Sequence, residues 1–169
     1  MSIDIGLLLL RVITGVLLAG HGMQKISYRF GGHGLRGGIE EFRSDGFRGG
    51  AITALAAGLG QLGSGLFLAA GLATPAAAMA AIGVMTVAAT VKARNGLWVQ
   101  HDGYEFPLVL ITIASALAFT GAGAYSVDAL LGLDHLVPWF GLGAVTLGVG
   151  AGLTARLVLH TPNPSRTES

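Results

Sequence analysis

Seven residues with hydrogen-bonding or protonatable side chains lie within or beside apolar stretches of the chain. They are His21, Lys25, Gln61, Trp98, His101, Tyr104 and Glu105. Histidine and glutamate can exchange protons, and together with aromatic side chains they can hydrogen-bond a quinone carbonyl or bind a metal. Polar residues embedded in a membrane are candidates for function because their burial in lipid is costly. We therefore expect these residues to line one small-molecule pocket.

Each of these residues also has a purely structural interpretation. His21 fits a residue at the membrane boundary, Glu105 fits a helix cap, and Trp98 and Tyr104 fit an aromatic belt. A metal site is a third interpretation, but two histidines and one glutamate without the spacing of metal ligands favour it only weakly. We assign no metal, and the structural and small-molecule interpretations both stay open.

Arg11 lies inside the first apolar stretch, about 9 Å along a helix from its start. A charge at that depth is costly unless its side chain reaches the water boundary or finds a partner. Asp128 follows the fourth apolar stretch and reaches the same membrane face when successive helices alternate in direction. We predict a structural ion pair between Arg11 and Asp128, with a direct role in binding a ligand or proton as the alternative.

Five apolar segments must position these residues. They cover roughly residues 5–23, 51–72, 75–91, 106–120 and 138–160. Most approach the ~20 residues that a helix needs to cross ~30 Å of hydrocarbon. Hydrophobic residues make up 52% of the chain and charged residues 11%, against about 25% charged residues in soluble domains. The sequence predicts an all-α membrane four-helix bundle with an additional C-terminal fifth transmembrane helix.

Local signals refine the ends and faces of these helices. Thr74 and Pro75 fit an N-cap and a first helical position. Asp102 and Glu105 have the spacing of a capping box before the fourth helix. In the fifth segment small residues repeat every four positions, a pattern that lets helix backbones pack closely. These small residues are Ala144, Gly148 and Gly152.

The distribution of lysine and arginine predicts the orientation in the membrane. The 24–50 and 92–104 loops are basic, whereas the 121–137 loop has neither lysine nor arginine. The positive-inside rule then places the N-terminus outside and the C-terminus in the cytoplasm. The net charge is only +1, so the chain lacks the excess positive charge that is typical of nucleic-acid-binding proteins. The chain has no cysteine, so it performs no thiol chemistry itself.

Several short motifs resemble those of the DoxX family of small bacterial membrane proteins. They are residues 9–11, 21–25, 30–35, 59–65, 71–75, 96–98, 103–107 and 121–128. The resemblance extends over roughly residues 5–132, which implies a four-helix membrane domain at 1–132, an added helix at 133–160 and a polar tail at 161–169. The chain departs from the family pattern at Gln61, where a glutamate is frequent, and at Ser64, where a second glycine is frequent. A proton-carrying role for residue 61 is correspondingly weakened.

The resemblance implies a multi-pass protein of the bacterial cell membrane that is linked to redox chemistry. Relatives are associated with quinone-linked oxidoreductases and with oxidative-stress complexes. We therefore expect a subunit of such a complex that binds a quinone-like molecule, with the lipid bilayer and other proteins of the complex, or further copies of this chain, as partners. Two alternatives remain: a non-catalytic scaffold that recruits soluble enzymes, and a small carrier or lipid-binding protein.

Overall fold

The computed structural model describes residues 2–133 and 137–161, and in that part of the chain all regular elements are helical. Five long helices correspond to the predicted apolar segments, and their ends differ from the predicted ends by no more than three residues. They are α1 Ser2–Ile26, α3 Ala51–Ala70, α4 Thr74–Lys92, α5 Glu105–Thr120 and α7 Val137–Leu159. The predicted all-α fold is confirmed.

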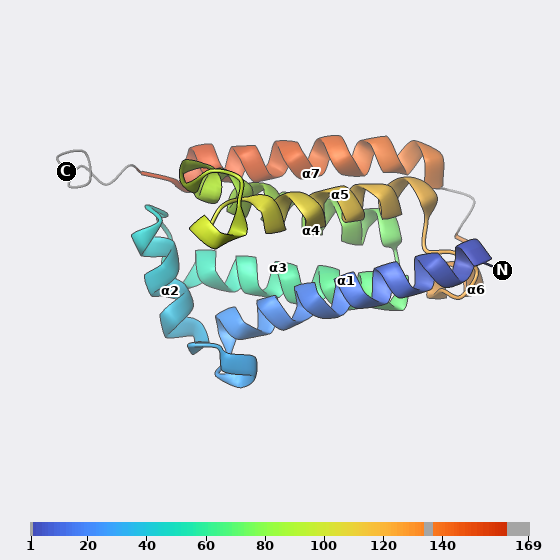
Figure 1. The fold of residues 1–169 in the computed structure, drawn as a ribbon, viewed down its shortest axis with the longest axis horizontal. Coiled ribbons are helices and arrows are strands. Elements are labelled where there is room, and N and C mark those ends of the chain that lie inside the picture. The colour runs from blue at the N-terminus through green and yellow to red at the C-terminus, as the bar shows by residue number, and fades with distance from the viewer. Residues whose placement is uncertain (1, 134–136, 162–169) are drawn as a thin grey trace.

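The five long helices lie side by side, and short elements cover the two ends of the bundle (Figure 1). Helix α2 (Gly34–Ser44) crosses one end, which we call the α2 end. Helix α6 (Val127–Leu130) lies at the opposite end, next to the start of α1, and we call this the α6 end. Three single 3-10 turns complete the elements of the described residues at Arg29–Gly31, Ala93–Asn95 and Val99–His101.

Helix pairing divides the bundle into two layers. Helix α1 packs mainly on α3, whereas α4 packs on α5 and α7. The contact between α3 and α4 joins the layers, and α3 and α7 share no extended contact. Side chains along the outer faces are largely apolar, among them Leu9, Leu66 and Leu147, each more than half exposed. An apolar exterior of this kind is suited to lipid.

Within residues 2–133 and 137–161, four helices are long and apolar enough to cross a membrane: α1, α3, α4 and α7. Helix α5 has 16 residues and is shorter, but it lies alongside α4 and α7 (Figure 1). The chain is therefore a membrane protein with several apolar helices.

Small residues set the closest helix contacts. A Cβ atom on Gly15 would lie 2.4 Å from the carbonyl oxygen of Gly65, so the backbones of α1 and α3 touch there. On α7, a Cβ on Gly148 would lie 2.7 Å from the Met79 carbonyl oxygen, and one on Gly152 would lie 2.6 Å from that of Gly83. The small-residue repeat predicted in the fifth segment is the surface that packs on α4.

Two predicted helix caps differ in the structure. Helix α4 begins at Thr74 itself after Ala73, a left-handed residue, and the cap is supplied from a distant part of the chain by Asp128. Before α5 no capping box forms, since Asp102 pairs with Lys92 and the Glu105 carboxylate accepts a bond from the Val99 amide. The sequence spacing identified residues near the helix starts but not their hydrogen-bond partners, because the tertiary structure determines those partners.

Candidate functional site

A cavity with a volume of about 760 Å³ lies between α3, α4 and α7. Helix α4 forms its floor, and α3 and α7 form its walls. Its lining is mostly small and apolar, and the wall residues Ala56, Gly150 and Ala151 are exposed at the bundle surface. The cavity, which we call the α3–α7 groove, is thus open sideways, toward the hydrocarbon of a membrane.

Gln61 is the polar residue at mid-length of α3 and lines this groove. Its side chain is only 5% exposed, and its Oε1 atom has no hydrogen-bond partner. A buried polar atom without a partner costs roughly 1–3 kcal/mol. The groove therefore holds an unsatisfied hydrogen-bond acceptor in apolar surroundings.

Charged side chains surround the groove where it reaches the α2 end. Lys25, Glu41, Asp45 and Lys92 belong to its lining. Lys25 Nζ lies 2.7 Å from a carboxylate oxygen of Glu41, and Arg94 Nη2 lies 3.0 Å from one of Asp45. Burial raises the pKa of the Asp45 carboxyl, and the nearby Arg94 acts in the opposite direction. The groove is apolar along the membrane and polar at its mouth.

The end of α7 is fastened to the α2–α3 connection beside this mouth. The Arg48 amide donates to the Leu159 carbonyl at 2.7 Å, and the Thr161 amide donates to the Gly46 carbonyl at 2.7 Å. Phe47 packs edge-on against the ring of His160, with 5.7 Å between the ring centres. Burial, followed by the charge of Arg156, lowers the pKa of the His160 imidazole. This clasp, residues 46–48 with 159–161, closes the groove between α3 and α7 at one end.

The structure separates the seven predicted pocket residues into two groups. Lys25 and Gln61 line the α3–α7 groove. The other five do not line it: His21, Trp98, His101, Tyr104 and Glu105. His21 is exposed and packs against Phe106, with 5.2 Å between the ring centres, so it lies beside the start of α5. Trp98 and His101 are exposed in the turn before α5, and no cluster of three potential metal ligands is found among the described residues.

Sequence reasoning missed Glu41, Asp45 and Phe47 as residues of the groove mouth. They fall in a basic, glycine-rich stretch that reads as a surface loop. Nothing in the local pattern shows that this stretch folds back over the ends of α4 and α7.

Arg11 and Asp128 are both buried at the α6 end, with exposures of 2% and 6%. The Arg11 guanidinium donates to the carbonyls of Ala69 and Tyr125. Asp128 accepts from the amides of Ala73 and Thr74, at 2.7 and 2.9 Å, and from the Thr74 hydroxyl at 2.6 Å. Among the described residues no salt bridge joins the two side chains directly, although the charge of Asp128 acts on Arg11. The predicted partners therefore lie in one network in which each charge is satisfied mainly by backbone groups.

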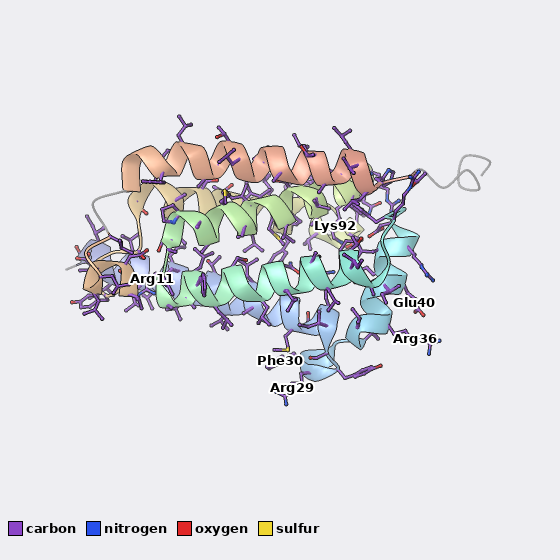
Figure 2. The ribbon with its side chains drawn as sticks, turned by 180° about the vertical axis from the view of Figure 1, so that it is seen from behind. Arg11, Arg29, Phe30, Arg36, Glu40 and Lys92 are labelled. Carbon is purple, nitrogen blue, oxygen red and sulfur yellow. The ribbon has the colours of Figure 1, made fainter. Side chains whose placement is uncertain are left out.

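Figure 2 places Arg11 at the end of the bundle opposite to Arg29, Phe30, Arg36, Glu40 and Lys92. The Arg11–Asp128 network is thus remote from the groove mouth. It joins α1 to the α3–α4 turn and to the chain after α5.

The family model of DoxX matches residues 6–94, which is more than half of the chain and includes α1 to α4. No curated protein and no solved structure matches the chain. The matched region ends just after α4, whereas the motifs in the sequence suggested a resemblance as far as residue 132.

Proposed function

The chain belongs to the DoxX family of membrane proteins, and on that basis we propose that it binds a lipid-soluble, quinone-like molecule in the α3–α7 groove. The observation that carries the proposal is the unpartnered Oε1 of Gln61 inside an apolar groove of about 760 Å³. Small-molecule sites are typically apolar cavities with few, well-placed polar groups. A hydroxylated ring at this depth would satisfy the amide, and an apolar tail would contact the groove walls.

The shape of the groove favours a ligand that arrives through the membrane. Its walls open toward lipid, and the charged groups at its mouth are already paired with one another. A water-soluble ionic ligand would have to break those pairs, whereas a neutral molecule dissolved in the bilayer would not. The quinol form suits Gln61 best, because its hydroxyl groups donate the hydrogen bond that Oε1 lacks.

We infer that any electron transfer requires a second protein. The chain has no cysteine, so it cannot carry out thiol-based redox chemistry itself. In this proposal the chain is a membrane subunit of a redox complex, which holds the quinone-like molecule for a partner that carries electrons.

Two glycines of α7 allow a matched test. A Cβ atom at Gly150 or at Gly143 meets no atom within 4 Å, but only Gly150 lines the groove. Gly150→Phe should fill the groove and weaken binding of decylubiquinol by at least about tenfold, which corresponds to roughly 1.4 kcal/mol. Gly143→Phe, two turns away on the same helix, should bind normally. Titration of the purified proteins in lipid nanodiscs measures both.

The same titration distinguishes the alternatives. If Gly150→Phe binds decylubiquinol as the unmodified chain does, the groove is not the site. If none of the three proteins binds quinol or quinone, the proposal fails, and a scaffold that recruits soluble enzymes becomes the better interpretation.

A further inference from the structure

A strained, exposed loop follows α1 and has no role in the proposed groove. Phe30 has a left-handed backbone (φ 54°, ψ 33°) although it is not a glycine. Its side chain is 73% exposed, and that of Tyr28 is 78% exposed. Left-handed backbone is unfavourable for an ordinary side chain, and such strain tends to occur at functional sites. We call residues 27–33 the aromatic loop.

The aromatic loop is held firmly in this conformation. The Gln24 side-chain amide donates to the Phe30 carbonyl at 2.7 Å, and the Gly34 amide donates to the Ser27 carbonyl at 3.2 Å. At Gly32 a Cβ atom would lie 2.3 Å from the Ser27 carbonyl oxygen, so the turn admits only glycine there. The loop projects sideways from the bundle beside the end of α1, and Arg29 and Phe30 point away from the bundle (Figure 2). The exposed Phe30 ring is therefore held in place by a fixed backbone, and the exposed Tyr28 ring lies beside Gly34 at the start of α2.

A second cavity begins beneath this loop. It has a volume of about 440 Å³ and runs along the outer faces of α1 and α3, which are membrane-spanning helices. Gly20, Met23, Leu62 and Leu66 belong to its mostly apolar lining, and Gln24 and Phe30 form the end nearest the loop. Its occupant must therefore have an apolar part that lies along the membrane span.

Two exposed arginines lie on the aromatic loop and on the helix that follows it. Arg29 is exposed at the loop itself, and Arg36 lies on the adjoining helix α2 with its side chain 88% exposed. The nearest carboxylate to Arg36 is that of Glu40 at 3.7 Å, a weak surface pair. Both guanidinium groups are thus accessible to an anion at the membrane boundary.

We propose that the aromatic loop and the cavity beneath it bind an anionic phospholipid. One acyl chain lies in the cavity between α1 and α3, and Arg29 faces the phosphate and headgroup. Arg36, on the outer side of α2, adds positive charge at the same membrane boundary, and Tyr28 and Phe30 lie at headgroup level. Aromatic rings favour this level of a bilayer, and basic residues there attract anionic lipid. A soluble protein partner would contact the loop but would not fill a cavity along the hydrocarbon span, so the lipid accounts for both features.

Lipid selectivity tests the headgroup half of the proposal. Native mass spectrometry of the detergent-purified chain should show tighter binding of phosphatidylglycerol than of phosphatidylcholine. Arg29→Gln should weaken phosphatidylglycerol binding by roughly fivefold, and Arg29→Gln with Arg36→Gln by roughly 25-fold, since each basic residue near the surface contributes about that factor. Arg94→Gln, which removes an arginine that faces Asp45, is the control and should leave lipid binding unchanged. Equal binding of the two lipids would overturn the proposal and favour a protein partner for the loop.

Substitutions at Phe30 and at Gly20 test the loop and the cavity. Phe30→Gly relieves the left-handed strain, so its melting temperature in detergent should equal or exceed that of the unmodified chain while lipid affinity falls. A lower melting temperature with unchanged lipid affinity would mean that Phe30 serves the fold, against the proposal.

Gly20→Leu should fill the cavity and lower the affinity for both lipids, whereas Gly6→Leu, also in open space on α1, should not. Unchanged affinity in Gly20→Leu would also overturn the proposal.

Discussion

At the scale of single residues, Gln61 is a residue that stability alone does not explain. Its side chain is almost fully buried in an apolar groove, and one of its polar atoms has no partner. A leucine of similar size would avoid that cost. In the proposed function, the ligand supplies the bond that this side chain lacks.

Gln61→Leu should therefore separate stability from binding. We expect the thermal stability of the chain in detergent to be unchanged or raised by about 1 kcal/mol, because an unpaired buried group is removed. Decylubiquinol binding in nanodiscs should be lost. Gln100→Leu, which alters an exposed loop residue, is the control and should change neither property. A marked loss of stability in Gln61→Leu would show that the amide serves the fold.

Asp128 presents the opposite case, because all of its interactions stabilise the fold. Asp128→Asn replaces an acceptor of three hydrogen bonds by a group that donates toward the same amides. We expect a loss of about 3–5 kcal/mol, as for other broken buried charge networks. Asp102→Asn is the control, since its pair with Lys92 is exposed and should cost less than about 1 kcal/mol. Chemical unfolding in mixed micelles measures both.

The Arg11–Asp128 coupling is tested by a double-mutant cycle. The two charges share one network, so Arg11→Ala and Asp128→Ala together should cost less than the sum of the single changes by about 0.5–3 kcal/mol. Strict additivity would show that the two residues act independently, each through its own backbone partners.

At the scale of elements, α7 has one face that has no room for a side chain larger than glycine and one face that has room for it. Gly148 and Gly152 touch the backbone of α4, whereas Gly150 faces the open groove. Gly148→Ala should destabilise the chain by about 1–3 kcal/mol through overpacking. Gly150→Ala should stabilise it by up to about 1 kcal/mol through helix propensity. Melting temperatures with the same sign for both variants would contradict the observed packing.

The helices could be predicted from the sequence because their signals are local. Apolar length, the Thr74-Pro75 start and the small residues of α7 depend on a few neighbouring positions. The partners could not be predicted in the same way. Asp128 caps a helix more than fifty positions earlier, Glu41 and Asp45 close a groove formed by later helices, and His21 meets Phe106 rather than Gln61. Such contacts depend on how the helices pack, which one sequence does not reveal.

At the scale of the whole molecule, basic residues are concentrated at the α2 end. Among the described residues Arg11 is the exception to this rule, and it is buried in the network at the α6 end. The positive-inside rule therefore still predicts that the α2 end faces the cytoplasm. In intact cells, a cysteine at exposed Gln100 should be protected from an impermeant maleimide, and one at exposed Leu130 should react with it. The reverse pattern would invert the orientation.

The two ends of the bundle also differ in their response to salt. At the α6 end buried side chains bond to backbone groups, which dissolved ions hardly screen. At the α2 end the groove mouth depends on partly exposed ion pairs such as Lys25 with Glu41, which ions do screen. Raising ionic strength should therefore loosen the contact of α2 with the rest of the α2 end, while the network at the α6 end hardly changes. Ionic strength thus becomes a means of loosening one end of the bundle while the other end stays intact.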